Sequence, residues 1–353
     1  MKRLGLKLSS GIGRALSHKI KQTQRLSRKT AAVILLLMGA ALVSLVSLGF
    51  AKLADYALHL NAKWSQQYPM AAFAVLPISL MLIVWFTRRY APYTAGSGIP
   101  QVLATLSMPK VKGGNRLVAL WRTALKIPLT FLGMLAGASI GREGPSVQVG
   151  AAVMLAWGSW CKRYNLAFKR LQDKELLAAG AAGGLAAAFN APLAGVIFAI
   201  EELGRSVSLH WERQIFIGVL ASGFFLVAIE GNSTYFQGFN AGQPAEHMLR
   251  WALLCAAVCG VAGGLFARFL SKGATWLALP QWRNWMRRHP IWLAGVFGLM
   301  LAALGVLFDG QTYGTGYDVA AAALHGQTDL TYGLAGAKWA ATVLSYWAGI
   351  PGG

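Results

Sequence analysis

The chain has 353 residues, of which 56% are hydrophobic and only 13% are charged. A soluble domain carries roughly a quarter charged residues, so this composition excludes a soluble globular protein and predicts an integral membrane protein. The formal net charge of +21 would suggest a nucleic-acid partner in a soluble protein. Here the basic residues stand mainly between apolar runs, so we expect no nucleic-acid partner.

The first 29 residues are rich in Lys and Arg and contain no carboxylate. Directly before a hydrophobic run, such a segment is typical of a cytoplasmic tail under the positive-inside rule. We therefore expect residues 1–29 to form a basic cytoplasmic amino-terminal segment. A helix lying on anionic lipid is the alternative, and the length of the segment argues against a cleaved signal peptide.

Apolar runs follow along the whole chain, and several approach the ~20 residues that a membrane-spanning helix needs. They cover residues 31–51, 71–86, 117–136, 215–229, 251–270, 291–308 and 334–350. These runs predict an all-α membrane protein built as a multi-helix bundle.

Between residues 90 and 198 the apolar segments are short and are broken by Gly and Pro. The interruptions lie at residues 96–100, 141–145, 180–184 and 190–192. In hydrocarbon, broken backbone persists only where it is buried in protein or lines a hydrated cavity. Repeated interruptions therefore predict half-helices arranged around a transport site. The glycines at 180–184 and 260–264 also have the small-residue spacing of closely packed helices.

A faint internal repeat favours inverted-topology repeats. Gly-Ser-Gly at residues 96–98 is followed by Lys126, and Gly-Thr-Gly at residues 314–316 is followed by Lys338. Chance matches in a glycine-rich chain are the alternative. The polar stretch after Glu230 divides the chain into a first transmembrane repeat, residues 30–230, and a partial second repeat, residues 231–353.

The motif Gly-Ser-Gly-Ile-Pro at residues 96–100 predicts a helix that begins at Ile99. Glycines leave backbone N–H groups accessible, and Pro is compatible with a first helical turn. Such a helix would direct its positive dipole end and its unpaired N–H groups at the Ser97 hydroxyl. This arrangement can hold an anion weakly enough for release. A serine N-cap in a tight turn is the alternative.

The motif Gly-Arg-Glu-Gly-Pro at residues 141–145 places an ionisable pair in apolar sequence, which in a membrane indicates function. Arg142 and Glu143 are adjacent and point apart on a helix, so a structural ion pair between them is disfavoured. As a carboxylate near a helix start, Glu143 would occupy a place where an anion could bind. Protonation would discharge it, so we predict that Glu143 is a gate and a proton carrier.

Four further polar positions stand out. Asn190 is predicted to be the N-cap of a helix that ends at Glu201 and Glu202. Acids at a helix carboxyl end are electrostatically unfavourable, which suggests that these two take up protons from water. Lys126 would face protein or water and add positive potential to an anion path. Because no nucleophile–base or metal-ligand pattern is present, we expect no enzyme activity, metal or cofactor.

Together, these motifs resemble the chloride channel and chloride/proton antiporter (CLC) family in order and approximate spacing, from about Ala31 to the last residue. The resemblance implies a homodimer in the plasma membrane, the inner membrane of a bacterium, with lipid, chloride and protons as partners. It also implies chloride binding by a small group of residues around the two glycine-rich motifs. These are Ser97, Gly98, Ile99, Arg142 and Gly144.

The same resemblance implies that Glu143 is the gating glutamate, Glu202 the internal proton-transfer acid with Glu201 beside it, and Lys126 an electrostatic contributor. An acid at Glu202 is similar to the exchangers of the family, which favours H+/Cl− exchange. A voltage- or pH-gated chloride channel without proton coupling is the alternative. Ser97 suits chloride, because members that favour nitrate tend to carry Pro at this place.

The chain departs from the family pattern at its end. The next family motif, Gly-x-Phe-x-Pro, would begin at about Gly353, and its amides would complete the chloride site. We therefore expect a fragment or truncated product with an incomplete second repeat, and a non-transporting product is a third hypothesis.

Overall fold

The computed structural model describes residues 2–108, 116–164, 166, 172–204, 213–232, 236, 238, 247–276, 278–326 and 331–353. Side chains are described from residue 30 onward and, in α9, from residue 215. The described elements are helices and one isolated β-bridge, which confirms the all-α prediction. The first half contains α1 (Lys2–Gln67), α2 (Ala72–Tyr90), α3 (Ile99–Ser107), α4 (Leu120–Ala124), α5 (Lys126–Ala136), α6 (Glu143–Arg163), α7 (Asp173–Ala188), α8 (Pro192–Phe198) and α9 (Arg213–Glu230).

The remaining helices are α10 (Met248–Lys272), α11 (Pro280–Arg288), α12 (Pro290–Leu307), α13 (Tyr317–Leu324) and α14 (Leu334–Trp347). The described residues also form short turns of helix: η1 (Pro69–Ala71), η2 (Pro92–Thr94), the π-helical η4 (Ala199–Leu203) and η5 (Ala274–Trp276). Among the residues that the structure describes, four helical segments are long and apolar enough to cross a membrane. They are Thr30–Gln67, Pro69–Tyr90, Met248–Lys272 and Pro290–Leu307.

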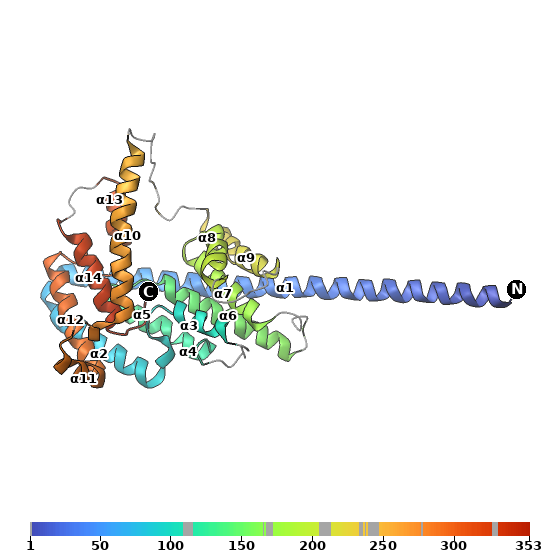
Figure 1. Ribbon diagram of the computed structural model, residues 1–353, viewed down its shortest axis with the longest axis horizontal. Coiled ribbons are helices and arrows are strands. Elements are labelled where there is room, and N and C mark those ends of the chain that lie inside the picture. Colours follow the sequence, from blue (N-terminus) through green and yellow to red (C-terminus); the bar gives the residue numbers. More distant parts are fainter. Residues whose placement is uncertain are drawn as a thin grey trace.

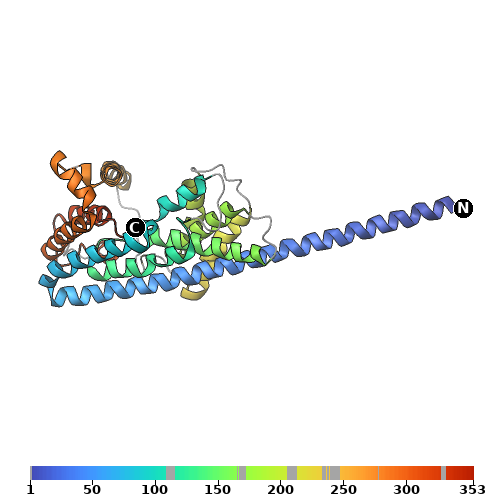
Figure 2. The ribbon, with the colours of Figure 1, turned by 90° about the horizontal axis from the view of Figure 1, so that it is seen from below.

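Helix α1 is continuous from the basic amino-terminal segment into the first apolar span. Figure 1 shows its amino-terminal part extending far from the other helices, and Figure 2 shows its remainder running along one side of them. There it packs against α5, α6, α7 and α9. The backbone of residues 2–29 is thus helical and forms one element with the span that follows.

The apolar run 117–136 is two helices, α4 and α5, and the expectation of one span there is wrong. Pro128 lies in the first turn of α5 and has no N–H for the carbonyl of Ala124, four residues earlier. The chain therefore breaks between Ala124 and Lys126. This break places Lys126 at the start of a helix instead of in the middle of one.

Helices α6 and α7 pack closely against each other, as the glycines at 180–184 predict. A Cβ built on Gly184 would lie 3.3 Å from the Cα of Gly150 and would overlap the carbonyl of Ser146. Gly180 meets the carbonyl of Gly150 in the same way. The glycines at 260–264 differ, because a Cβ on Gly260, Gly263 or Gly264 meets nothing within 4 Å in the part of the chain that the structure describes.

The close contact of Gly184 with the backbone of α6 predicts that Gly184→Leu loses much of the protein's stability. The added side chain meets backbone atoms that cannot rotate away, so α6 and α7 must separate, which costs about 3 kcal/mol. Thermal unfolding in detergent, followed by size-exclusion chromatography, measures the loss. Gly263→Leu in α10 is the matched control, and equal melting temperatures for the two variants would contradict the assignment.

Candidate anion and proton site

Helix α3 begins at Ile99, as predicted, and Gly98 is the residue that turns the chain into it. Gly98 has a left-handed φ of 101°, which a residue with a side chain adopts only with strain. Its carbonyl accepts the first intrahelical bond, from the N–H of Val102 at 3.2 Å. The N–H groups that precede Val102 in the first turn therefore remain available to a ligand beside Ser97.

Helix α6 begins at Glu143, with Arg142 as its N-cap residue. Its first turn packs directly against the Ser97 segment. A Cβ on Gly144 would lie 3.0 Å from the carbonyl oxygen of Ser97 and would overlap its hydroxyl oxygen. Only glycine therefore fits at position 144, and the two predicted motifs, separated widely in sequence, meet at this contact.

The Glu143 side chain folds back over the backbone that precedes it. A Cβ on Gly141 would overlap its Oε2 atom and lie 3.4 Å from its Cδ. Glu143 lines two cavities, one of about 530 Å³ and one of about 330 Å³. Glu143 thus lines both cavities and directly precedes Gly144, the residue that contacts Ser97.

The last residues of the chain join the two glycine-rich motifs. Gly141 donates its N–H to the carbonyl of Gly353 at 2.7 Å, and the N–H of Gly353 donates to the carbonyl of Gly141 at 2.9 Å. Gly96 donates to the carbonyl of Ile350 at 3.0 Å and pairs with Pro351 in the isolated β-bridge. The segment that follows α14 thus lies between the starts of α3 and α6.

Lys126 is completely buried beneath the start of α3. Its Nζ atom lies 2.8 Å from the position of a Cβ on Gly98 and donates to Oε1 of Gln148 at 2.8 Å. The amide of Gln148 is fixed in turn, since its Nε2 donates to the carbonyls of Tyr93 and Leu117. No ion pair among the described residues includes Lys126, and the acceptor of its Nζ atom under α3 is the neutral amide of Gln148.

Lys338 takes a comparable place beneath the start of α13. Gly316, the left-handed N-cap residue of α13, would place a Cβ 2.9 Å from Cε of Lys338. The Lys338 ammonium donates to the carbonyls of Thr312, Tyr313 and Gly314. The Gly-Ser-Gly and Gly-Thr-Gly segments thus share a local feature, a left-handed glycine next to a lysine that is buried at Lys126 and half-buried at Lys338. This likeness supports the internal repeat at these two places.

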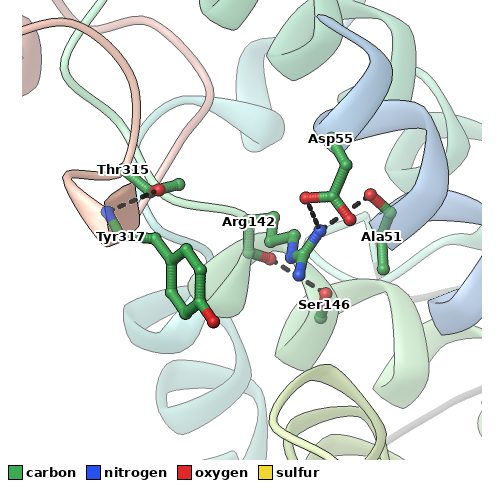
Figure 3. Close-up of polar contacts among 6 residues, drawn as sticks. All are labelled: Ala51, Asp55, Arg142, Ser146, Thr315 and Tyr317. Carbon is green, nitrogen blue, oxygen red and sulfur yellow. Dashed lines mark hydrogen bonds and ion pairs between the residues drawn. The ribbon is translucent and has the colours of Figure 1, made fainter. Parts of the chain in front are cut away.

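The Arg142 side chain turns toward α1 (Figure 3), where its Nη1 atom lies 2.5 Å from Oδ1 of Asp55 and 2.7 Å from the carbonyl of Ala51. Sequence reasoning missed Asp55 and Gln148. A signal for Asp55 existed, because it is the only acid between residues 30 and 67. Gln148 stands in apolar sequence, and nothing local indicated its partner.

Glu201 and Glu202 lie in the π-helical turn after α8, with Glu201 exposed and Glu202 half-buried. In the part of the chain that the structure describes, they line neither cavity that Glu143 lines. The predicted N-cap role of Asn190 is wrong. Asn190 has a φ of 51°, Ala191 is the N-cap residue, and the Asn190 amide donates to the carbonyl of Gly231 instead. The left-handed backbone turns this side chain away from the first turn of α8.

Comparison with known proteins decides the family. Residues 78–353 match the family described as voltage gated chloride channel. The chain belongs to this voltage-gated chloride channel family. It is 34% identical over 245 residues to the H+/Cl− exchange transporter ClcA of Vibrio cholerae, which covers 66% of this chain and 48% of that protein. It is 30% identical over 318 residues to the ClcA of Yersinia pestis, covering 87% and 61% respectively.

Solved structures of the family share the fold. A slow cyanobacterial Cl−/H+ antiporter superposes with a TM-score of 0.72 at 24% identity, over 92% of this chain and 75% of that one. A CLC-type fluoride/proton antiporter gives a TM-score of 0.69 at 22% identity, over 92% and 77%. The protein is an integral membrane protein of this fold. The chain spans about half the length of the Vibrio relative, and its curated relatives are transporters.

Proposed function

We propose that this protein takes part in chloride transport across a membrane by H+/Cl− exchange. The observation that carries the proposal is the contact between Ser97 and Gly144 in the first turn of α6, the helix that begins at Glu143. The starts of α3 and α6 would supply a hydroxyl group, backbone N–H groups and one titratable acid for this site. The relatives named H+/Cl− exchange transporter support the choice of ions.

Chloride would bind to the Ser97 hydroxyl and to N–H groups at the starts of α3 and α6. The residues that supply this site are Ser97, Gly98, Ile99, Arg142 and Gly144. Arg142 would contribute through its backbone, since its guanidinium is paired with Asp55. Lys126 adds positive potential from beneath α3. Hydrogen-bond donors at helix starts bind an anion without the tight hold of a full charge at contact.

The proton would pass through Glu143 and, on the other side, through Glu202 with Glu201 beside it. As a carboxylate, Glu143 competes with chloride for the α6 start. When it is protonated, the charge is lost and an anion can take the place. The exposure of Glu201 and the partial exposure of Glu202 suit groups that collect protons from water. Glu143 and Glu202 would thus give the proton a route separate from that of chloride.

The wider arrangement follows the same proposal. Residues 1–29 would lie in the cytoplasm, and the transporter would work as a homodimer in lipid of the plasma membrane, the inner membrane of a bacterium. Residues 30–230 would form the first transmembrane repeat and residues 231–353 the partial second one. Two observations support this division: α9 ends at Glu230, and a lysine lies against the N-cap glycine of both α3 and α13.

Glu202→Gln is the variant that separates exchange from a chloride channel. The amide cannot carry a proton, so proton uptake driven by a chloride gradient should fall to the level of empty vesicles while chloride flux continues. A pH-sensitive dye and a chloride electrode on reconstituted vesicles measure both flows. Glu201→Gln is the neighbouring control. Unchanged proton uptake in Glu202→Gln would contradict the role of Glu202, and no chloride flux from the wild-type chain would favour the non-transporting product.

A further inference from the structure

The cavity of about 530 Å³ in front of Glu143 is lined by two ion pairs. One joins Arg142 to Asp55, and the other joins Lys52 on α1 to Glu230 at the end of α9 at 2.8 Å. All four side chains line the cavity together with Glu143. Only the first pair includes Arg142, the residue directly before Glu143.

We propose that Asp55 is a positioning residue for anion transport, whose carboxylate clamps the Arg142 guanidinium against α1 and so keeps its charge off the anion beside Glu143. The inference rests on the proposed function. Arg142 is the N-cap residue of α6, and its side chain extends from the start of that helix to Asp55 on α1 (Figure 3).

The geometry of the pair suits a clamp. The guanidinium donates to the Asp55 carboxylate at 2.5 Å and to the Ala51 carbonyl at 2.7 Å, two acceptors one helical turn apart on α1. The carbonyl of Arg142 accepts the Ser146 hydroxyl at 2.9 Å, which ties the backbone to the first turn of α6. The side chain of Arg142 is thus held by α1 and its backbone by α6, so α1 determines where the guanidinium charge lies.

The exposed fractions of the two side chains show that Arg142 depends on Asp55 for its counter-charge. The Arg142 side chain is only 16% exposed, whereas that of Asp55 is 62% exposed. Removing Asp55 therefore leaves a largely buried cation without its counter-ion, a state that a mobile anion can relieve. Chloride that enters the cavity would then be held by a full charge, and its release would slow.

The first test measures the position of Arg142 without relying on transport. In Asp55→Ala, the freed guanidinium should react with phenylglyoxal several-fold faster than in the wild type, as mass spectrometry of the peptide that contains Arg142 reports. Glu230→Ala is the matched control, because it removes an acid from the same cavity and frees Lys52 instead. Asp55→Glu should restore protection. Unchanged reactivity of Arg142 in Asp55→Ala would overturn the clamp.

The second test measures the consequence for chloride. In reconstituted vesicles, Asp55→Ala should lower the apparent KM for chloride and the maximal turnover together, on the order of tenfold each, whereas Glu230→Ala should change both much less. The double variant Asp55→Ala/Arg142→Gln should return the KM toward the wild-type value, because no free charge remains.

The outcomes of the two tests remain separate. Equal effects of Asp55→Ala and Glu230→Ala on the chloride dependence would overturn the transport role, since they would report only the net charge of the cavity. If the wild-type chain moves no chloride, the proposed function fails and the transport role of Asp55 fails with it, while the phenylglyoxal result still decides whether the clamp exists.

Discussion

Glu143→Gln is expected to abolish proton movement and to leave chloride flux in place. The amide has nearly the same shape as the protonated acid but cannot become an anion, so it no longer competes for the start of α6 or carries a proton. A chloride gradient imposed on reconstituted vesicles should then drive no more proton uptake than empty vesicles show. Chloride flux should also lose its dependence on pH, since the titrating gate is gone.

Glu230→Gln is the control for this experiment, because it makes the same chemical change in the wall of the same 530 Å³ cavity. It removes one carboxylate from the cavity but none from the helix start. We expect Glu230→Gln to keep proton coupling. Retained coupling in Glu143→Gln, or its loss in both variants, would contradict the assignment of Glu143 as the gate.

Lys126→Gln is expected to weaken chloride binding by roughly tenfold. A unit charge at ~10 Å, with an effective dielectric constant of ~20, contributes on the order of 1 to 2 kcal/mol to the binding of an anion, and each ~1.4 kcal/mol is tenfold in the dissociation constant. The Gln side chain can still donate to Gln148, so the change tests charge more than packing. Isothermal titration calorimetry with chloride in detergent measures the affinity.

Lys52→Gln is the matched control for Lys126→Gln, because it removes a positive charge at an exposed position. The Lys52 side chain is 64% exposed and paired with Glu230, so solvent and salt screen its charge. We expect its effect on chloride affinity to stay below ~2-fold. Equal effects of the two substitutions would show that net charge, and not the buried position under α3, determines the affinity.

Local chemistry was enough to predict where the important helices begin. Gly98 permits a left-handed turn and Pro100 suits a first helical turn, so the start of α3 at Ile99 could be predicted from the sequence. The same holds for Glu143 at the start of α6. Asn190 shows the limit of this reasoning. Its residue type suits an N-cap, but its left-handed backbone directs the amide to Gly231.

Composition, apolar runs and the glycine-rich motifs by themselves determined that this is an all-α membrane protein and identified the residues most worth testing. Only the tertiary structure decided which of these residues meet. The partner of Arg142 is Asp55, 87 residues away, and the hydroxyl that covers Gly144 belongs to Ser97. The physical reason is that backbone preference acts over a few neighbouring residues, whereas the direction of a charge depends on which distant helix supplies the counter-charge.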